Sequence, residues 1–466
     1  MIKKTCIILG ISAVYFVNAQ DISTLRNTVD AYSNSSLNGS ARYNAMAGSM
    51  GALGGEVSVL NSNPAGIGVN IASEMSGTLS ITKSNNSSSF NGSSIDYKVN
   101  NTDLGNVGGV VAFRVAGNSP WKFVNIGVNY SNQSIEDYTE TPGNANINFN
   151  AIGANNIPTT LSYAGHAYNR YGNLSKMSMA VGANYDNRIY VGGGLNFHTL
   201  VVDQYDSAAF QSSSDNNTAE YHKQYTPFSE SSNGFSATVG IIGKINPQFR
   251  VGAALETPTW WTIERAFDEY ENPTDGTYSE NRTLSTPLKA TLSAAFVPSK
   301  NLAVNIDYTI GLTKPQYKVR GDAETELNSF FNDHSRSMSE IKAGAEYRID
   351  AFRLRAGYAY ANSPFNSVDL NSFSDAGTSG NNSFDKLLVG NRTTFGAGLG
   401  YDFKSFYLDA AYQSISSDYQ NPFLAGSAAN NAGYFSDKYV VESNSSIVSN
   451  VKNKKDNFFL TLGWKF

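Results

Sequence analysis

Few side chains in this sequence are arranged to do covalent chemistry. The four histidines, His166, His198, His222 and His334, are far apart, and none has the spacing of a nucleophile and base or of zinc ligands. The only cysteine, Cys6, lies in an N-terminal leader, so the mature chain has no thiol. We therefore expect no catalytic site, no metal and no cofactor, and we predict that the protein is not an enzyme.

The charged side chains instead follow a period of two. Apolar residues at 352, 354, 358 and 360 alternate with Arg353 and Arg355, and those at 302 to 310 alternate with Asp307. This pattern is typical of strands with one face in lipid and the other in a lumen. A charge on the lipid face would cost roughly 2 to 4 kcal/mol near the bilayer midplane. We therefore place these charges in a lumen and expect them to form supporting ion pairs rather than a selective filter: Arg114, Glu346, Arg353 and Arg355.

The strands that position these charges are separated by short turns that alternate with long polar loops. Such alternation is typical of the periplasmic and extracellular ends of an outer-membrane barrel. Six tight turns, together with an opening strand near residues 74–83 and a closing strand at the C-terminus, predict an all-β, 14-stranded antiparallel barrel. Pro, Asn, Asp and Ser supply the turn chemistry at residues 118–120, 185–188, 245–248, 298–301, 349–351 and 402–404.

The last eleven residues alternate without a break and stop on an aromatic residue. Phe458, Leu460, Leu462, Trp464 and Phe466 share one face. A half-buried strand of a soluble sandwich has the same pattern, so this strand alone does not decide the fold. Within the barrel prediction it is the closing strand, and Trp464 and Phe466 are the expected C-terminal signal for the barrel assembly machinery.

The N-terminus predicts the compartment. Lys3 and Lys4 precede the apolar run 7–17, so residues 1–19 are predicted to be a secretory signal peptide. No later run is long enough for a transmembrane helix, so any membrane span is expected to be a strand. The net charge of −5 becomes more negative once the leader is removed, which disfavours a nucleic-acid partner. We predict an outer-membrane protein with both termini in the periplasm.

Residues 20–73 fit no membrane strand. They contain the small-residue stretches 39–48 and 51–55 and then Asn63, Pro64, Ala65 and Gly66, an ordered turn signal directly before the first strand. With the signal peptide, the strand count and the terminal Phe466, this tetrapeptide resembles the N-terminal hatch of the FadL-type long-chain fatty acid transporters. The stretch from 39 to 68 looks most like the Bacteroidetes branch of that family.

The resemblance implies three segments: a signal peptide at 1–19, a hatch inside the lumen at 20–73, and an outer-membrane barrel at 74–466. It also implies that hydrophobic molecules such as long-chain fatty acids are captured at the outer loops and released sideways through the wall into outer-membrane lipid. Asn63, Pro64, Ala65 and Gly66 are carried over as hatch residues. No loop motif of the family is matched, so no fatty-acid contact is carried over.

Aromatic side chains in the long loops are candidates for ligand contact. Trp260 and Trp261 are expected to belong to an interfacial girdle rather than to a pocket, and the role of Phe330 and Phe331 stays open. Two other functions also remain open. One is a secretion-system component or cargo shuttle built on a similar barrel, and the other is a general porin for small solutes. The candidate contacts are Trp260, Trp261, Phe267, Phe330 and Phe331.

Overall fold

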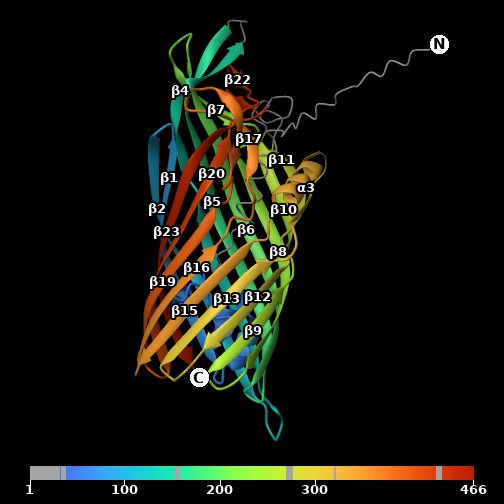
Figure 1. Cartoon of the computed structure of the whole chain (residues 1–466), viewed down its shortest axis with the longest axis vertical. Coiled ribbons are helices and arrows are strands. Elements are labelled where there is room, and N and C mark those ends of the chain that lie inside the picture. The colour runs from blue at the N-terminus through green and yellow to red at the C-terminus, as the bar shows by residue number, and fades with distance from the viewer. Residues whose placement is uncertain (1–31, 33–37, 153–157, 269–276, 320–321, 427–432) are drawn as a thin grey trace, which may run out of the picture.

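Antiparallel strands close into a tall barrel, which stands upright in Figure 1. The computed structural model describes residues 32, 38–152, 158–268, 277–319, 322–426 and 433–466. The closing strand β23 (Ile447–Lys465) pairs with the opening strand β1 (Glu74–Phe90) from Glu74↔Lys465 to Ser89↔Asn450. Closure leaves no free sheet edge at this junction, as a membrane barrel requires.

The predicted 14-stranded antiparallel barrel is confirmed. All six expected tight turns lie between consecutive strands, at the lower end in Figure 1, where the C-terminus also lies. In pairing order the remaining strands are β2 (Ser93–Arg114), β3 (Trp121–Glu136), β5 (Pro158–Tyr185), β6 (Ile189–Ser212), β8 (Phe228–Lys244), β9 (Phe249–Glu256) continued by β10 (Trp260–Asp268), β11 (Thr277–Ser285) continued by β12 (Lys289–Phe296), β13 (Leu302–Gly311) continued by β14 (Gln316–Lys318), β15 (Ser339–Ile349), β16 (Phe352–Ala361), β19 (Asn391–Asp402) and β20 (Phe406–Phe423).

Three neighbouring strands are interrupted where the sequence has a proline: Pro258, Pro287 and Pro315. Proline lacks the N–H that a ladder needs, so the pairing must stop or bend there. The breaks lie side by side, because Thr286 N donates to Thr259 O at 3.1 Å across the first two. These interruptions were not predicted.

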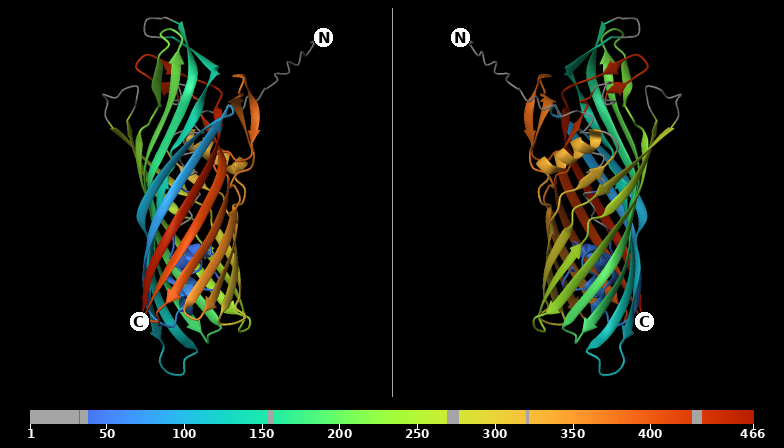
Figure 2. Two further views of the ribbon diagram at one scale, coloured as in Figure 1. Left: turned by 90° about the vertical axis from the view of Figure 1, so that its left-hand side faces the viewer. Right: turned by 90° about the vertical axis from the view of Figure 1, so that its right-hand side faces the viewer.

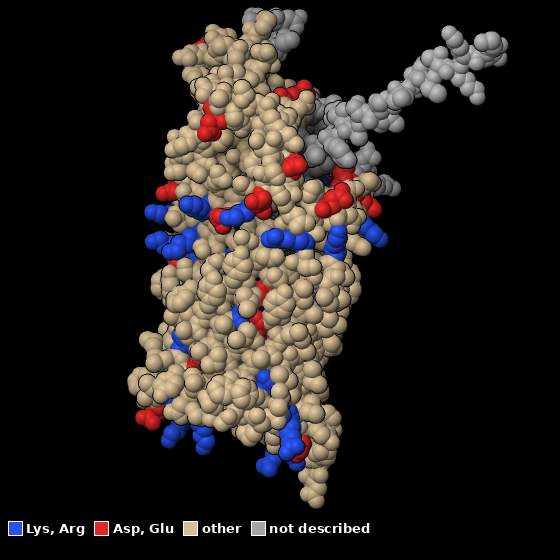
Figure 3. Space-filling model, in the orientation of Figure 1, with Lys and Arg blue, Asp and Glu red and all other residues tan. Residues whose placement is uncertain are grey.

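The two faces of the wall have the predicted polarity. On β13, Ile306 and Tyr308 are exposed on the outside, whereas Asn305 and Asp307 are buried inside. On β19, Leu399 is 62% exposed, as expected for a side chain that meets lipid. In Figure 3 the middle of the wall is nearly free of surface charge, with Lys, Arg, Asp and Glu gathered above and below it.

Residues 38–70, which we call the inner segment, lie inside the lower half of the barrel (blue in Figures 1 and 2). They form three short helices: α2 (Ala41–Ala45), η1 (Val57–Asn61) and η2 (Pro64–Val69). Met46, Met50, Val59 and Ile67 are fully buried against the wall. The predicted signal peptide lies outside the described residues, as does the N-terminus itself.

The upper end carries the long connections. The helix α3 (Asp322–His334) and the hairpin of β17 (Val368–Phe373) and β18 (Ser379–Phe384) lie on one side of it (Figure 2). A separate apolar core builds the tall part opposite, from β4 (Thr139–Ile152), β7 (Thr218–Lys223), β21 (Tyr434–Phe435), β22 (Val440–Val441) and the upper ends of β5, β6 and β20. None of the described helices has the length and apolar character needed to cross a bilayer.

Candidate functional site

The inner segment is fastened to the wall by its Asn-Pro turn. Asn63 is buried, and its side chain accepts from Ala65 N at 3.1 Å and donates to Gly51 O at 2.8 Å and to Ile241 O of β8 at 3.3 Å. Pro64 occupies the first turn of η2, where a missing N–H costs nothing. The tetrapeptide predicted from sequence therefore holds the inner segment together and joins it to the barrel.

Glycines of the wall let the inner segment approach this closely. A Cβ atom on Gly192 of β6 would lie 2.5 Å from Pro64 C, and one on Gly357 of β16 would lie 2.2 Å from Met46 C. Neither distance is tolerable without a backbone shift. The glycine cluster at 192–194 predicts a bend or a close backbone approach, and Gly192 is the member that approaches Pro64.

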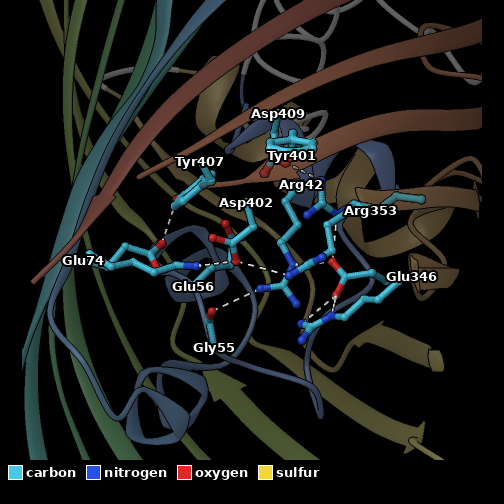
Figure 4. A pocket seen from close by; sticks show the side chains of 13 residues that line it. Arg42, Gly55, Glu56, Glu74, Glu346, Arg353, Tyr401, Asp402, Tyr407 and Asp409 are labelled. Atoms are coloured by element: carbon cyan, nitrogen blue, oxygen red, sulfur yellow. Dashed lines mark hydrogen bonds and ion pairs between the residues drawn. The ribbon is translucent and has the colours of Figure 1, made fainter. Parts of the chain in front are cut away.

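An ionic network joins the inner segment to the opposite wall (Figure 4). Glu346, which is 2% exposed, accepts from Arg42 Nε of α2 at 2.9 Å and from Arg355 Nε at 2.8 Å. Arg355 also donates to Asp409 at 2.8 Å. Arg353 lies nearby and pairs with Asp402 at 3.2 Å. These side chains surround a polar cavity of about 160 Å³.

Three of the four predicted lumen charges, Glu346, Arg353 and Arg355, thus lie together. Arg114 does not join them: it is the last residue of β2 and is exposed, because the strand ends at the lower rim there. The partner that sequence reasoning missed is Arg42. It lies in a segment with no strand periodicity, so no face could be assigned to it.

Two ionisable groups of the inner segment are shifted by this environment. Burial raises the pKa of Glu56 to about 7, against the opposing influence of Arg42 and of the hydroxyl of Ser40. In the described chain Glu56 Oε1 has no hydrogen-bond partner, which favours the protonated form. Burial acts to lower the pKa of Arg42, but Glu346 and Glu56 outweigh it and hold this pKa above its ordinary value.

The upper lumen is apolar. Side chains from β6, β10, α3 and the loop before β19 form one buried group, which we call the upper-lumen cluster, including Leu200, Trp261, Ile263, Leu327, Phe331, Leu388 and Val389. Phe330 packs against it. The buried ion pair of Arg265 and Glu230 lies beside the cluster, with the two side chains 2.8 Å apart. Tyr32 donates to Glu230 at 2.6 Å and stacks edge-on against Trp261 at 5.0 Å.

The structure divides the predicted ligand contacts. Trp261 and Phe331 are buried in the upper-lumen cluster, at 5% and 1% exposure. Trp260 is 49% exposed on the outer face, in agreement with a girdle position. Trp261 is therefore a correction to the girdle assignment, because adjacent strand residues point to opposite faces. Phe267 lies apart from the cluster and contacts Tyr225, with ring centres 4.9 Å apart.

A small cavity of about 80 Å³ lies between the upper-lumen cluster and the wall. Its apolar lining is Ile135, Leu174, Leu388 and Val389, and its polar lining includes Arg170, Asp137 and Lys455. Lys455 and Asp137 are 3.6 Å apart. This lining places an apolar surface beside cations that bind acidic groups, in a volume well below the roughly 300 to 1,000 Å³ of pockets that enclose a drug-sized ligand.

The wall beside this cavity is incompletely paired. β2 and β3 pair only from Asn106↔Ser131 to Arg114↔Phe123. Above that point the described part of β2 pairs with β1 alone and β3 pairs with β5 alone, leaving what we call the seam. Side chains bridge it, because Asn101 Nδ2 donates to Ser134 Oγ at 2.6 Å. Ile135, which lines the cavity, belongs to the part of β3 above its last pair with β2.

Among the described residues no group of His, Cys, Asp and Glu side chains is arranged to hold a metal ion. No protein-family model and no curated protein matches this sequence. The fold, however, is similar to solved structures over almost its whole length.

A FadL homologue from Pseudomonas aeruginosa aligns with a TM-score of 0.54 and 13% identity, covering 92% of this chain and 98% of that one. The toluene transporter TodX of P. putida aligns at 0.51 and 12% identity, covering 92% and 99%. The monoaromatic hydrocarbon channel CymD aligns at 0.50 and 12% identity, covering 92% and 97%. At these identities the similarity establishes a shared barrel fold.

Proposed function

We propose that this protein is an outer-membrane transporter for hydrophobic solutes, with long-chain fatty acids or similar amphiphiles as substrates. The observation that carries the proposal is the cavity beside the seam, where Ile135, Leu174 and Leu388 share the lining with Arg170 and Lys455. The fold shared with a FadL homologue, a toluene transporter and a monoaromatic hydrocarbon channel supports the class of solute.

The residues 20–73 act as the hatch in this proposal, following a signal peptide at 1–19 and preceding the barrel at 74–466. The described part of the hatch fills the lower lumen, and the charged network around Glu346 makes that half a poor path for an alkyl chain. Each CH₂ group gains about 0.8 kcal/mol from apolar burial, which a polar passage would forfeit. Release through the seam into the bilayer avoids this cost.

The cations argue for an acidic amphiphile over a neutral hydrocarbon. A carboxylate would gain charge-assisted hydrogen bonds from Arg170 and Lys455, and its chain would extend along the apolar lining toward the seam. Lys455→Gln should therefore reduce uptake of a long-chain fatty acid and leave toluene uptake unchanged. The neighbouring Lys454→Gln is a matched control, because Lys454 is exposed on the outer face.

The experiment is uptake into liposomes that carry the purified mature protein. We expect entry of a labelled long-chain fatty acid without leakage of a small sugar, and altered entry in Asn63→Ala. Sugar passage alone would instead identify a porin. Failure to move either solute, with stable capture of secretion components, would favour the shuttle function.

A further inference from the structure

Four lysines lie on the outer face of three neighbouring strands, directly above the lipid-facing belt. They are Lys98 on β2, Lys83 on β1, and Lys452 and Lys454 on β23, and all four are exposed. On the same faces, Ile81 lies directly below Lys83, and Phe458 lies below Lys454 with Asp456 between them; Ile81 and Phe458 are 45% and 52% exposed. The lysines therefore begin where the apolar belt ends.

The strand register places these lysines close together. Asn85 of β1 pairs with Lys98 on one side and with Lys454 on the other. Strands are about 4.8 Å apart, so the backbones of Lys98 and Lys454 are separated by roughly 10 Å, comparable with the screening length at physiological salt. Ser87 is the next residue of β1 above Asn85 on this face, and it pairs with Lys452. One multivalent anion can therefore contact several of them.

Acidic neighbours neutralise only part of this charge. Lys454 pairs with Asp456 at 3.2 Å, and Asp418 pairs with Lys386. Asp96 also lies on this face, on β2 opposite Ser87. Within the described ranges, Lys83, Lys98 and Lys452 form no ion pair. Figure 3 shows Lys and Arg gathered above the nearly uncharged middle of the wall, with Asp and Glu among them.

A polar cleft of about 860 Å³ adjoins the lysines and shares Lys452 with them. One side carries hydroxyl and amide side chains, among them Ser87, Ser89 and Asn450, and Asp375 also lines the cleft. Phe373 and Phe384 of the β17–β18 hairpin line the other side. Hydroxyls and amides both donate and accept hydrogen bonds, and aromatic rings pack on apolar C–H faces, so this lining suits a sugar.

We propose that this face binds a phosphorylated glycolipid of the outer leaflet. The acyl chains lie on the apolar belt, the lysines bind the phosphates, and the sugars enter the cleft. The order along the membrane normal, apolar then cationic then hydroxyl-rich, matches the order of chain, phosphate and sugar in such a lipid. The inference depends on the long loops being extracellular and is independent of what the lumen transports.

The test is binding of phosphorylated lipid A, against chemically dephosphorylated lipid A, to the delipidated mature protein in detergent. Lys83→Gln combined with Lys98→Gln should weaken binding of the phosphorylated lipid about 25-fold, roughly fivefold per lysine. Lys300→Gln combined with Lys404→Gln removes the same charge from exposed turns at the lower end and should change binding less than twofold.

Three outcomes would overturn the proposal. If both double variants lost the same affinity for the phosphorylated lipid, the binding would be non-specific attraction by net charge. Equal affinity for the phosphorylated and dephosphorylated lipid would remove the role of the lysines. Equal binding of phosphatidylglycerol, at matched charge, would show an anionic-lipid surface without a sugar site.

Discussion

The lower and upper halves of the lumen are filled by different means. Below, the inner segment packs against glycines and is held by a charged network centred on Glu346. Above, apolar side chains around Trp261 and Phe331 pack beside a small cavity and an unpaired stretch of wall. In the proposed transporter, the polar half seals the lumen and the apolar half contacts the solute.

Removing the Glu346 carboxylate, the centre of the charged network, should destabilise the protein more than any other change described below. Glu346→Gln leaves Arg42 and Arg355 without their shared carboxylate, and breaking a buried pair costs about 3 to 5 kcal/mol. We expect release of the inner segment, seen as faster proteolysis within residues 38–70 and a lower unfolding temperature. Arg348→Gln, at the exposed rim of the same network, should change both by much less. Equal effects would show that the network does not fasten the inner segment.

The raised pKa of Glu56 makes this fastening pH-dependent. Its pKa is about 7 in the folded protein and 4.5 when unperturbed, so protonated Glu56 stabilises the inner segment fully below pH 4.5, and the contribution is lost as pH rises through 7. At 1.36 kcal/mol per unit, the loss is at most about 3 kcal/mol. Proteolysis of the inner segment should accelerate over this range.

Glu56→Gln provides the control for that prediction, because it stays neutral at every pH. Its proteolysis rate should be flat between pH 4.5 and 7. A variant that kept the wild-type pH profile would assign the titration to another group.

Filling the wall beneath the Asn-Pro turn should have a smaller effect. In Gly192→Val the new Cβ atom would overlap Pro64, and overpacking typically costs about 1 to 3 kcal/mol. We expect sugar leakage through planar bilayers as the inner segment is displaced. Gly193→Val points outward, with its nearest atom 4.0 Å away, and should leave the barrel sealed. Sugar leakage in both variants would show that valine disturbs β6 itself and not its contact with Pro64.

The smallest expected effect lies at the seam. Asn101→Ala removes one side-chain hydrogen bond, worth about 1 kcal/mol, between β2 and β3. Fatty-acid release should become modestly faster while fatty-acid affinity stays constant, as measured by stopped-flow transfer to acceptor vesicles. A change in affinity with no change in release rate would place the effect in the binding cavity.

Period-two patterning and turn chemistry are sufficient to predict the strands, because alternation within each strand's own sequence separates its inward side chains from its outward ones. Alternation alone assigns Glu346, Arg353 and Arg355 to the inward face, and the three line one polar cavity. Contacts between segments distant in sequence leave no such local signal. Arg42 with Glu346 could not be predicted for this reason, nor could the cavity shared by Leu174, Leu388 and Lys455.

Some missed features did have a local signal. Tyr168 and Arg170 share one face of β5, so alternation places Arg170 in the lumen. Alternation also places the adjacent residues Trp260 and Trp261 on opposite faces of β10. Pro258, Pro287 and Pro315 mark the strand breaks directly.

The central claim is that solute leaves through the seam. Cysteines at Asn101 and Ser134, joined by a short, reducible thiol cross-linker, would close it, and the only native cysteine, Cys6, lies in the predicted leader. The control joins Thr291→Cys to Thr309→Cys, a pair within the intact β12–β13 ladder. We predict that cross-linking the seam stops fatty-acid uptake into liposomes and that reduction restores it, while the control stays active throughout. Undiminished uptake with the seam closed would contradict the account.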